Sequence, residues 1–359
     1  MISKKNIIIA LILVPLLLLF FWPEKKYKAY EVADEFQKQV DSFYLPNMPP
    51  DWSWHYFEAV DGTKLRWGET GNRGAAKATV IIIPGYSATM SMYGEHADML
   101  ARRGYHVVGI DMRGQGGSDR YRDNQPEKLW IDDFKVYSDD LASFIKSIKS
   151  TTKQPIIPIG VSFGGHVAVR MAGEHMDVID SLVLVAPAIV PKTGALSYKK
   201  SKFLIELSRF FGKSNRYLIG EGNWRPFRRD LSVANIDLCA SNPKRLPYRD
   251  VVFTRNSEER VGGVTAQWAG EFLASSEVIN TKAFLSSIDI PITMISAEID
   301  HLVDTNTNQI SCDSIFPNCI RVDVNNSGHC LFQESDEILS IIFDSVDDLL
   351  VFNSKPKAP

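Results

Sequence analysis

Short apolar runs alternate with helical segments through most of this 359-residue chain, and this alternation constrains its fold more than any other feature. The runs lack the polar alternation of a half-exposed strand, so each predicts a strand buried on both faces. They lie at 78–83, 106–111, 156–161, 182–186, 292–297 and 320–324. Amphipathic helices are expected at 91–103, 132–149, 164–174 and 335–350. Such alternation predicts an α/β fold whose mostly parallel sheet carries helices on both faces.

Two features complete the predicted domain organisation. Residues 52–60 and 64–69 alternate around Asp61-Gly62, which predicts an antiparallel hairpin and raises the strand count to eight. About 100 residues separate the runs at 182–186 and 292–297, far more than one crossover requires. We therefore expect an α/β core interrupted by one inserted cap or lid. The predicted parts are a core at 51–190 and 291–359, a cap at 191–290, a spacer at 25–50 and a separate segment at 1–24.

The N-terminal segment predicts a membrane anchor. Lys4 and Lys5 precede an uncharged apolar run of 16 residues, from Ile7 to Trp22, which as a helix would span about 24 Å. A cleaved signal peptide is the alternative, but no small residues follow the run where signal peptidase would cut. We expect a single-pass anchor. A short basic N-terminus usually stays in the cytoplasm, so the body is expected outside it, in the periplasm of a Gram-negative cell.

Charge and cysteine content restrict the partners and the compartment. The chain has 40 Lys+Arg and 43 Asp+Glu, so no basic excess favours a nucleic-acid partner. Cys312 and Cys319 flank a short segment and can form a disulfide in an oxidising compartment, or remain idle thiols. Cys239 and Cys330 have no evident partner, and no pair of cysteines has the spacing of zinc ligands.

The motif Gly160-Val161-Ser162-Phe163-Gly164 lies between a predicted strand and a predicted helix. This context turns a weak G-x-S-x-G match into a strong prediction of a nucleophilic serine on a sharp strand-to-helix turn. The flanking glycines allow close passage of neighbouring chain, and the helix N-terminus favours developing negative charge. Ser162 is the predicted nucleophile.

A serine hydroxyl needs a base, and the base needs an acid to orient it. His329 follows the last predicted strand, where this topology would deliver a histidine to the same edge of the sheet. Asp300 follows the penultimate strand and is the expected acid, whereas Asp304 is expected to cap the next helix. The order Ser162, Asp300, His329 matches the chain order of α/β-hydrolases. The expected oxyanion donors are the backbone N–H groups of Phe163 and Tyr86.

Taken together, several segments resemble the monoacylglycerol lipase and lysophospholipase L2 group of the α/β-hydrolase superfamily. They are 160–164, the run 111–119 (DMRGQGGSD), Asp300 with Val303-Asp304, and Gly328-His329. The resemblance covers about residues 60–350 and is weak in the cap. It implies a serine esterase without a metal or organic cofactor that acts on monoacylated glycerolipids or similar esters. The group usually has His-Gly in the oxyanion loop, and Pro84 replaces that histidine here.

The first part of the predicted cap is basic. Residues 191–230 hold ten Lys/Arg against three Asp/Glu, a net charge of +7, with aromatic and aliphatic residues between them. Basic amphipathic segments favour anionic membrane surfaces, although a solvated helix face has the same pattern. We expect the cap to contact the bilayer or the substrate through Trp224, Arg225, Arg228 and Arg229.

The sequence thus predicts a serine hydrolase that cleaves carboxylic esters of monoacyl lipids through a Ser162–His329–Asp300 triad and an acyl-enzyme. An aminopeptidase or amidase on the same fold is the alternative, and it would favour acidic cap groups that hold a free amine. A catalytically idle binding protein is the third possibility. Epoxide and haloalkane hydrolysis require an Asp nucleophile, which Ser162 excludes.

Overall fold

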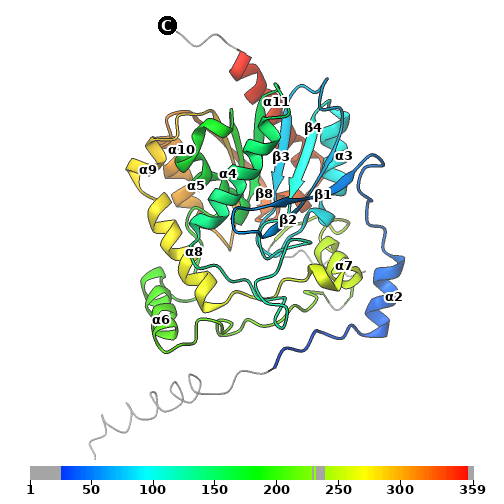
Figure 1. Ribbon diagram of the computed structural model, residues 1–359, viewed down its shortest axis with the longest axis vertical. Helices are drawn as coiled ribbons and strands as arrows, with labels where there is room; N and C mark the ends of the chain where they lie inside the picture. The colour runs from blue at the N-terminus through cyan, green and yellow to red at the C-terminus, as the bar shows by residue number, and fades with distance from the viewer. Residues whose placement is uncertain (1–25, 229, 232–238, 355–359) are drawn as a thin grey trace, which may run out of the picture.

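The computed structural model describes residues 26–228, 230–231 and 239–354, and its centre is one eight-stranded sheet (Figure 1). The strand order is β1-β2-β4-β3-β5-β6-β7-β8. β2 is antiparallel to both of its neighbours, and all the other pairs are parallel. The strands are β1 (Ser53–Glu58), β2 (Lys64–Thr70), β3 (Thr79–Ile83), β4 (His106–Ile110), β5 (Ile156–Val161), β6 (Leu182–Val185), β7 (Ile292–Ile299) and β8 (Cys319–Gly328). This confirms the predicted eight-stranded, mostly parallel sheet.

Helices cover both faces of this sheet. Pairing between α4 and α5 places these two helices on one face, while ion pairs from Arg103 at the end of α3 to Asp344 and Asp347 of α11 place α3 and α11 on the other (Figure 1). Every residue of β3, β4, β5 and β6 is buried, as expected for strands covered on both faces. The helices of the core are α3 (Gly94–Arg102), α4 (Lys135–Lys149), α5 (Phe163–Glu174), α10 (Thr305–Ser314) and α11 (Asp336–Ser354).

Between β6 and β7 the described residues form the further helices α6 (Tyr198–Phe210), α7 (Tyr248–Arg255), α8 (Ala266–Ile279) and α9 (Lys282–Ser286). In Figure 1 the first three lie below the sheet as drawn. α6 packs on α8 through a small apolar cluster of Ile205, Ala269 and Leu273. We call residues 191–290 the insertion; their division from the core as a separate cap stays a prediction.

Residues 26–50, which the sequence analysis assigned to a spacer, pack against the insertion. Within them, α2 (Asp34–Ser42) buries Phe36 and Val40 against Val251 of α7. Before α2, the ring of Tyr30 meets that of Trp224 edge-on at 5.9 Å. Phe36 and Val40 lie one helical turn apart and so share a face of α2, but the polar residues between them gave no sign of this packing in the sequence.

No helix in the described ranges is both long and apolar enough to cross a bilayer. The anchor predicted for residues 1–24 lies outside the described residues.

Candidate active site

Ser162 occupies the turn between β5 and α5 with an unusual backbone conformation. Its φ of 51° and ψ of −112° place it outside the regions that non-glycine residues ordinarily adopt. The turn is held by two backbone hydrogen bonds, from Ser162 N–H to Val185 O at 2.9 Å and from Ala188 N–H to Ser162 O at 3.0 Å. A Cβ on Gly164 would clash with the carbonyl oxygens of Ile83 and Pro84. The glycine therefore allows the β3 loop to pass directly over the serine.

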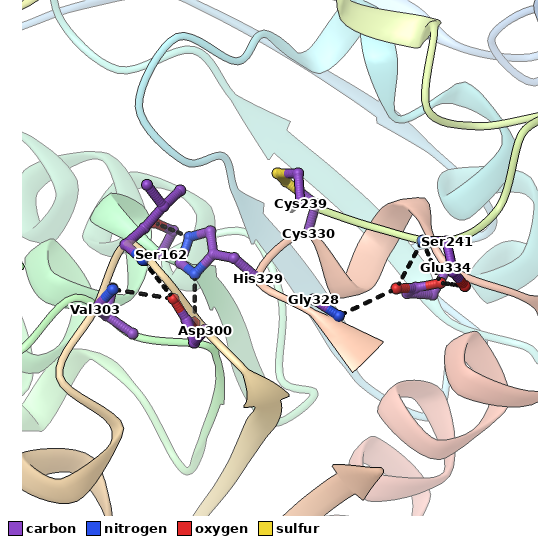
Figure 2. The surroundings of a disulfide bond; sticks show 10 residues. Ser162, Cys239, Ser241, Asp300, Val303, Gly328, His329, Cys330 and Glu334 are labelled. Carbon is purple, nitrogen blue, oxygen red and sulfur yellow. Dashed lines mark hydrogen bonds and ion pairs between the residues drawn. A yellow bond between two sulfur atoms is a disulfide. The ribbon is translucent and has the colours of Figure 1, made fainter. Parts of the chain in front are cut away.

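The three residues expected to form a triad are brought together by the structure (Figure 2). His329 Nε2 lies 2.8 Å from Ser162 Oγ, and His329 Nδ1 lies 2.6 Å from Asp300 Oδ2. The side chains of His329 and Asp300 are buried. Ser162, Asp300 and His329 lie at the same end of the sheet, because they follow the carboxyl ends of β5, β7 and β8.

The local environment of Asp300 keeps its carboxyl group ionised. Burial acts to raise its pKa, but the hydrogen bond and charge of His329, with the N–H groups of Val303 and Leu302, outweigh burial, so the pKa lies below its ordinary value. A carboxylate can only accept hydrogen bonds, so His329 Nδ1 must donate. In the neutral imidazole Nε2 is then the acceptor, and Ser162 Oγ–H donates to it.

The loop after β3 lies against Ser162, where the second oxyanion donor was expected. A Cβ on Gly85 would lie 3.4 Å from Ser162 Cβ. Ser87 takes a positive φ of 54°, and its N–H donates to Gln115 Oε1 at 2.6 Å. Tyr86 is anchored by its hydroxyl, which donates to Gly262 O at 2.6 Å. These contacts hold the loop that carries Tyr86 against Ser162, the residue directly before Phe163 and α5.

Sequence reasoning missed two residues that hold the loop after β3, where the oxyanion donor Tyr86 was expected. Gln115 belongs to the run 111–119 that was noted only as part of a resemblance, and it also donates to Gly85 O at 3.3 Å. Arg249 of α7 donates from Nε to Ser87 Oγ at 3.2 Å and lies 3.8 Å over the ring of Phe227. No sequence signal marked Arg249, because its contact with the loop depends on how the insertion folds back.

The structure pairs all four cysteines, which corrects the prediction for two of them. Cys239 and Cys330 had no evident partner in the sequence, yet they form a disulfide with their Cα atoms 4.9 Å apart. Cys312 of α10 and Cys319 of β8 form the second disulfide. The first pair is separated by 91 residues, and only the insertion's return to the His329 loop brings its members together.

The residues expected on the membrane or substrate side of the cap are placed differently from one another. Trp224 is 1% exposed, with its ring against Tyr30 and Phe253, so the expectation of a membrane-facing side chain is wrong for it. Arg225 is exposed and Arg228 is half-buried. Arg229 lies outside the described residues.

Asp304 caps α10, as expected, by accepting from the N–H groups of Asn306 and Thr307. Elsewhere in the described chain, one group of side chains has the chemistry of metal ligands, namely Asp139, Glu174 and His175. It lies outside the triad, and Lys135 forms ion pairs with both carboxylates of the group. The cluster is thus partly neutralised by the chain itself.

Comparison with known proteins agrees with this geometry. The Hydrolase_4 profile, described as serine aminopeptidase S33, matches residues 74–336. The chain is 26% identical over 281 residues to a probable lysophospholipase L2 of Haemophilus influenzae, covering 77% of this chain and 84% of that protein. It is also 26% identical over 237 residues to lysophospholipase L2 of Escherichia coli, covering 65% and 67% of the two chains.

Solved structures show the same fold. A soluble variant of the Saccharomyces cerevisiae monoglyceride lipase superimposes with a TM-score of 0.64 at 16% identity, covering 88% of this chain and 99% of that one. A thermostable carboxyl esterase of Bacillus coagulans gives a TM-score of 0.66 at 13% identity, covering 84% and 100%.

Proposed function

The chain belongs to the Hydrolase_4 family of α/β-hydrolases, and from this membership we propose that it is a serine hydrolase that cleaves the acyl ester of monoacyl lipids. The observation that carries the proposal is the continuous hydrogen-bonded path from Ser162 through His329 to Asp300, with heavy-atom distances of 2.8 and 2.6 Å. This arrangement supplies a nucleophile, a base in the required tautomer and an ionised acid.

In the acylation step, Ser162 Oγ attacks the ester carbonyl carbon while His329 Nε2 takes the hydroxyl proton. The negative charge that develops on the carbonyl oxygen is stabilised by the N–H groups of Phe163 and Tyr86 and by the N-terminus of α5. Asp300 stabilises the imidazolium without accepting its proton. The C–O bond to the glycerol moiety then breaks, and His329 Nε2–H protonates the departing oxygen.

In the deacylation step, water replaces the alcohol. His329 Nε2 takes a proton from the water, whose oxygen attacks the acyl carbon of the Ser162 ester. The second tetrahedral intermediate collapses, the proton returns to Ser162 Oγ, and the fatty acid leaves. No step requires a group beyond this chain, the ester and water.

The substrate class is supported by the relatives. The two proteins compared above are described as lysophospholipases, and a structural neighbour is a monoglyceride lipase. Lysophospholipids and monoacylglycerols, the substrates that these names imply, each have one acyl chain on a glycerol-based group. The family description also contains aminopeptidases, so release of an N-terminal residue is the second candidate.

We propose that the insertion rests on an anionic membrane surface. α6 buries Ile205 against α8 but leaves Phe203 65% and Phe210 83% exposed, and Lys199 and Lys200 on the same helix are also exposed. Such a helix can bury aromatic rings at the lipid boundary while lysines meet lipid phosphates. We also propose that residues 1–24 anchor the chain and that its body lies on the periplasmic side; this part rests on the sequence of residues 1–24 alone.

The function is tested with the full chain purified in detergent micelles. Its rates are measured on p-nitrophenyl esters with two to sixteen acyl carbons, a lysophospholipid, a monoacylglycerol and an amino-acid p-nitroanilide, with Ser162→Ala as the control. We expect ester rates that rise with chain length, cleavage of the monoacyl lipids and no activity in the variant. Release of p-nitroaniline without ester cleavage would instead establish the aminopeptidase alternative.

A further inference from the structure

The chain on the C-terminal side of His329 is covalently fastened to the insertion. Cys330, the residue directly after His329, is disulfide-bonded to Cys239 (Figure 2). The backbones of the same two residues are also joined, since Cys330 N–H donates to Cys239 O at 2.5 Å. Any displacement of the insertion at Cys239 is therefore transmitted to the residue adjoining the base.

The chain on the N-terminal side of His329 is fastened to the same part of the insertion by a buried carboxylate. Glu334 is fully buried, and its Oε1 accepts from the N–H of Gly328 at 3.3 Å. The carboxylate also accepts from Ser241, from N–H at 3.0 and 3.1 Å and from Oγ at 2.6 Å (Figure 2). One side chain thus joins the residue before His329 to a residue two positions after Cys239.

The backbone of Glu334 strengthens this junction. Its carbonyl oxygen accepts from Arg245 Nη1 at 2.6 Å and from Asn242 Nδ2 at 3.1 Å. Residues 239–245 therefore contact the loop 328–334 through one covalent bond and several hydrogen bonds. We call these two segments together the histidine clamp.

The sheet does not hold His329 by itself. β8 is an edge strand, and its ladder with β7 is irregular between Ala297 and Ile299, ending at the pair Ile299–Gly328. His329 thus follows the last paired residue of an edge strand, with β-pairing on one side only. The histidine clamp supplies support from the opposite side.

We propose that Glu334 and the Cys239–Cys330 disulfide are positioning groups, which hold His329 Nε2 at hydrogen-bonding distance from Ser162 Oγ and so couple the insertion to catalysis. The proposal rests on the hydrolase function proposed above. A displacement of about 1 Å between reacting groups can cost on the order of 10²-fold in rate. Opening the clamp should therefore lower kcat and leave KM almost unchanged, because the proposal gives both groups a role in placing His329 and none in binding the substrate.

Reduction opens the covalent half of the clamp. A dithiol reductant supplies two electrons and two protons, the Cys239–Cys330 bond breaks to give two thiols, and the reductant becomes a cyclic disulfide. Re-oxidation by a disulfide reagent reverses the reaction. Activity should follow this cycle in the wild-type chain.

The second disulfide provides a matched control. Cys319 is the first residue of β8 and is bonded to Cys312, whereas Gly328 is the last residue of that strand. The two bridges therefore lie toward opposite ends of one strand, and only one adjoins His329. The variants are Cys239→Ser/Cys330→Ser, Glu334→Gln and, as the control, Cys312→Ser/Cys319→Ser.

Three readouts separate positioning from stability. We measure kcat and KM on a p-nitrophenyl ester, the rate at which a fluorophosphonate labels Ser162 with loss of fluoride, and the downfield NMR signal of the His329 Nδ1–H proton. We expect the two clamp variants to lose at least tenfold in kcat and in labelling rate, with KM within twofold and the downfield signal weakened. The control should stay within twofold in every readout, and the clamp double variant should not respond to dithiol.

Equal kcat and labelling rates in the clamp variants and the wild type would overturn the proposal, as would the same loss in the control. If the double serine variant does not fold, Glu334→Gln, which retains both disulfides, and the dithiol-treated wild type carry the same comparison. Rapid labelling of wild-type Ser162 without hydrolysis of any monoacyl lipid would refute the proposed substrate and leave the positioning test intact.

Discussion

Asp300 Oδ2 lies 2.6 Å from His329 Nδ1, and the other carboxylate oxygen of Asp300 accepts hydrogen bonds from backbone amides of its own loop. Oδ1 accepts from Leu302 N–H at 2.8 Å and from Val303 N–H at 3.0 Å. The acid is thus oriented by backbone amides before it orients the imidazole. An amide side chain at this position could not satisfy both partners in the same way.

We predict that Asp300→Asn lowers kcat by about 10³- to 10⁴-fold, because an amide can donate to Nδ1 and favour the wrong imidazole tautomer. The ester assay measures this directly. Asp304→Asn is the matched control, since asparagine caps a helix as well as aspartate does and Asp304 serves α10. A loss of less than tenfold in Asp300→Asn would contradict the assigned role.

Gly164→Ala tests the close passage of the loop after β3, which is proposed to supply the Tyr86 oxyanion donor. The new methyl group would clash with the carbonyl oxygens of Ile83 and Pro84, so the loop that carries Tyr86 must move away from Ser162. We expect kcat to fall by about 10²-fold or more through loss of oxyanion stabilisation. Gly222→Ala, where a methyl group meets open space, should retain activity. Equal activity of the two variants would argue against this loop as the donor.

Two buried histidines predict how stability depends on pH. Burial lowers the pKa of His166 to about 3 and that of His96 to about 4, from an ordinary value of 6.5. Between pH 6.5 and 4 the unfolded chain binds protons that the folded chain cannot. The contribution of these two histidines to the free energy of unfolding should therefore be constant above pH 6.5. Below pH 6.5 it should decrease by about 1.4 kcal/mol per pH unit for each histidine.

Denaturant unfolding between pH 8 and 4 checks this expectation. His166→Gln should be less stable at pH 8, because the imidazole donates to Ala188 O and accepts from Ser275, but its stability should fall less steeply with acid. The exposed His301→Gln should reproduce the wild-type slope. An unchanged slope in His166→Gln would show that this group does not control the acid limb.

Charge reversal tests the proposed membrane contact of the insertion. Arg225→Glu/Arg228→Glu should weaken flotation with phosphatidylglycerol vesicles by at least tenfold, since each basic side chain near an anionic surface contributes about 1 kcal/mol. Binding to phosphatidylcholine vesicles, measured alongside, isolates the electrostatic part from apolar anchoring. Lys146→Glu/Lys153→Glu makes the same charge change on exposed residues of the core. Identical behaviour of the two double variants would exclude a specific role for the insertion.

Most of the sheet and the assembly of the site were predictable because both depend on short-range patterns. The four fully buried strands β3, β4, β5 and β6 are short apolar runs in the sequence, as such strands require. Ser162, Asp300 and His329 each follow the carboxyl end of a strand, so they meet at the same end of the sheet. β8 was predicted only to residue 324, because its last residues are polar. It continues to Gly328 because the ladder with β7 resumes after an irregularity.

The insertion was not predictable in the same way. Trp224 lies beside exposed Arg225 in the sequence, and its burial depends on Tyr30, almost 200 residues earlier. The Cys239–Cys330 bridge likewise joins residues that no local pattern relates. No pattern in the sequence distinguishes Glu334, which is fully buried, from a surface glutamate. These features arise from long-range packing, on which hydrophobic periodicity carries no information.

The packing of residues 26–50 limits how far the catalytic domain could move from a membrane anchor in residues 1–24. Tyr27 donates to Glu127, Lys28 O accepts from Asn223, and α2 lies on α7. Residues 26–50 are therefore fixed to the body and do not act as a flexible linker. With residues 1–24 anchored in a membrane, as proposed, the packed stretch would hold the catalytic domain close to the bilayer surface. It would meet lipids of its own leaflet at a high effective concentration, and lipids of a facing membrane hardly at all.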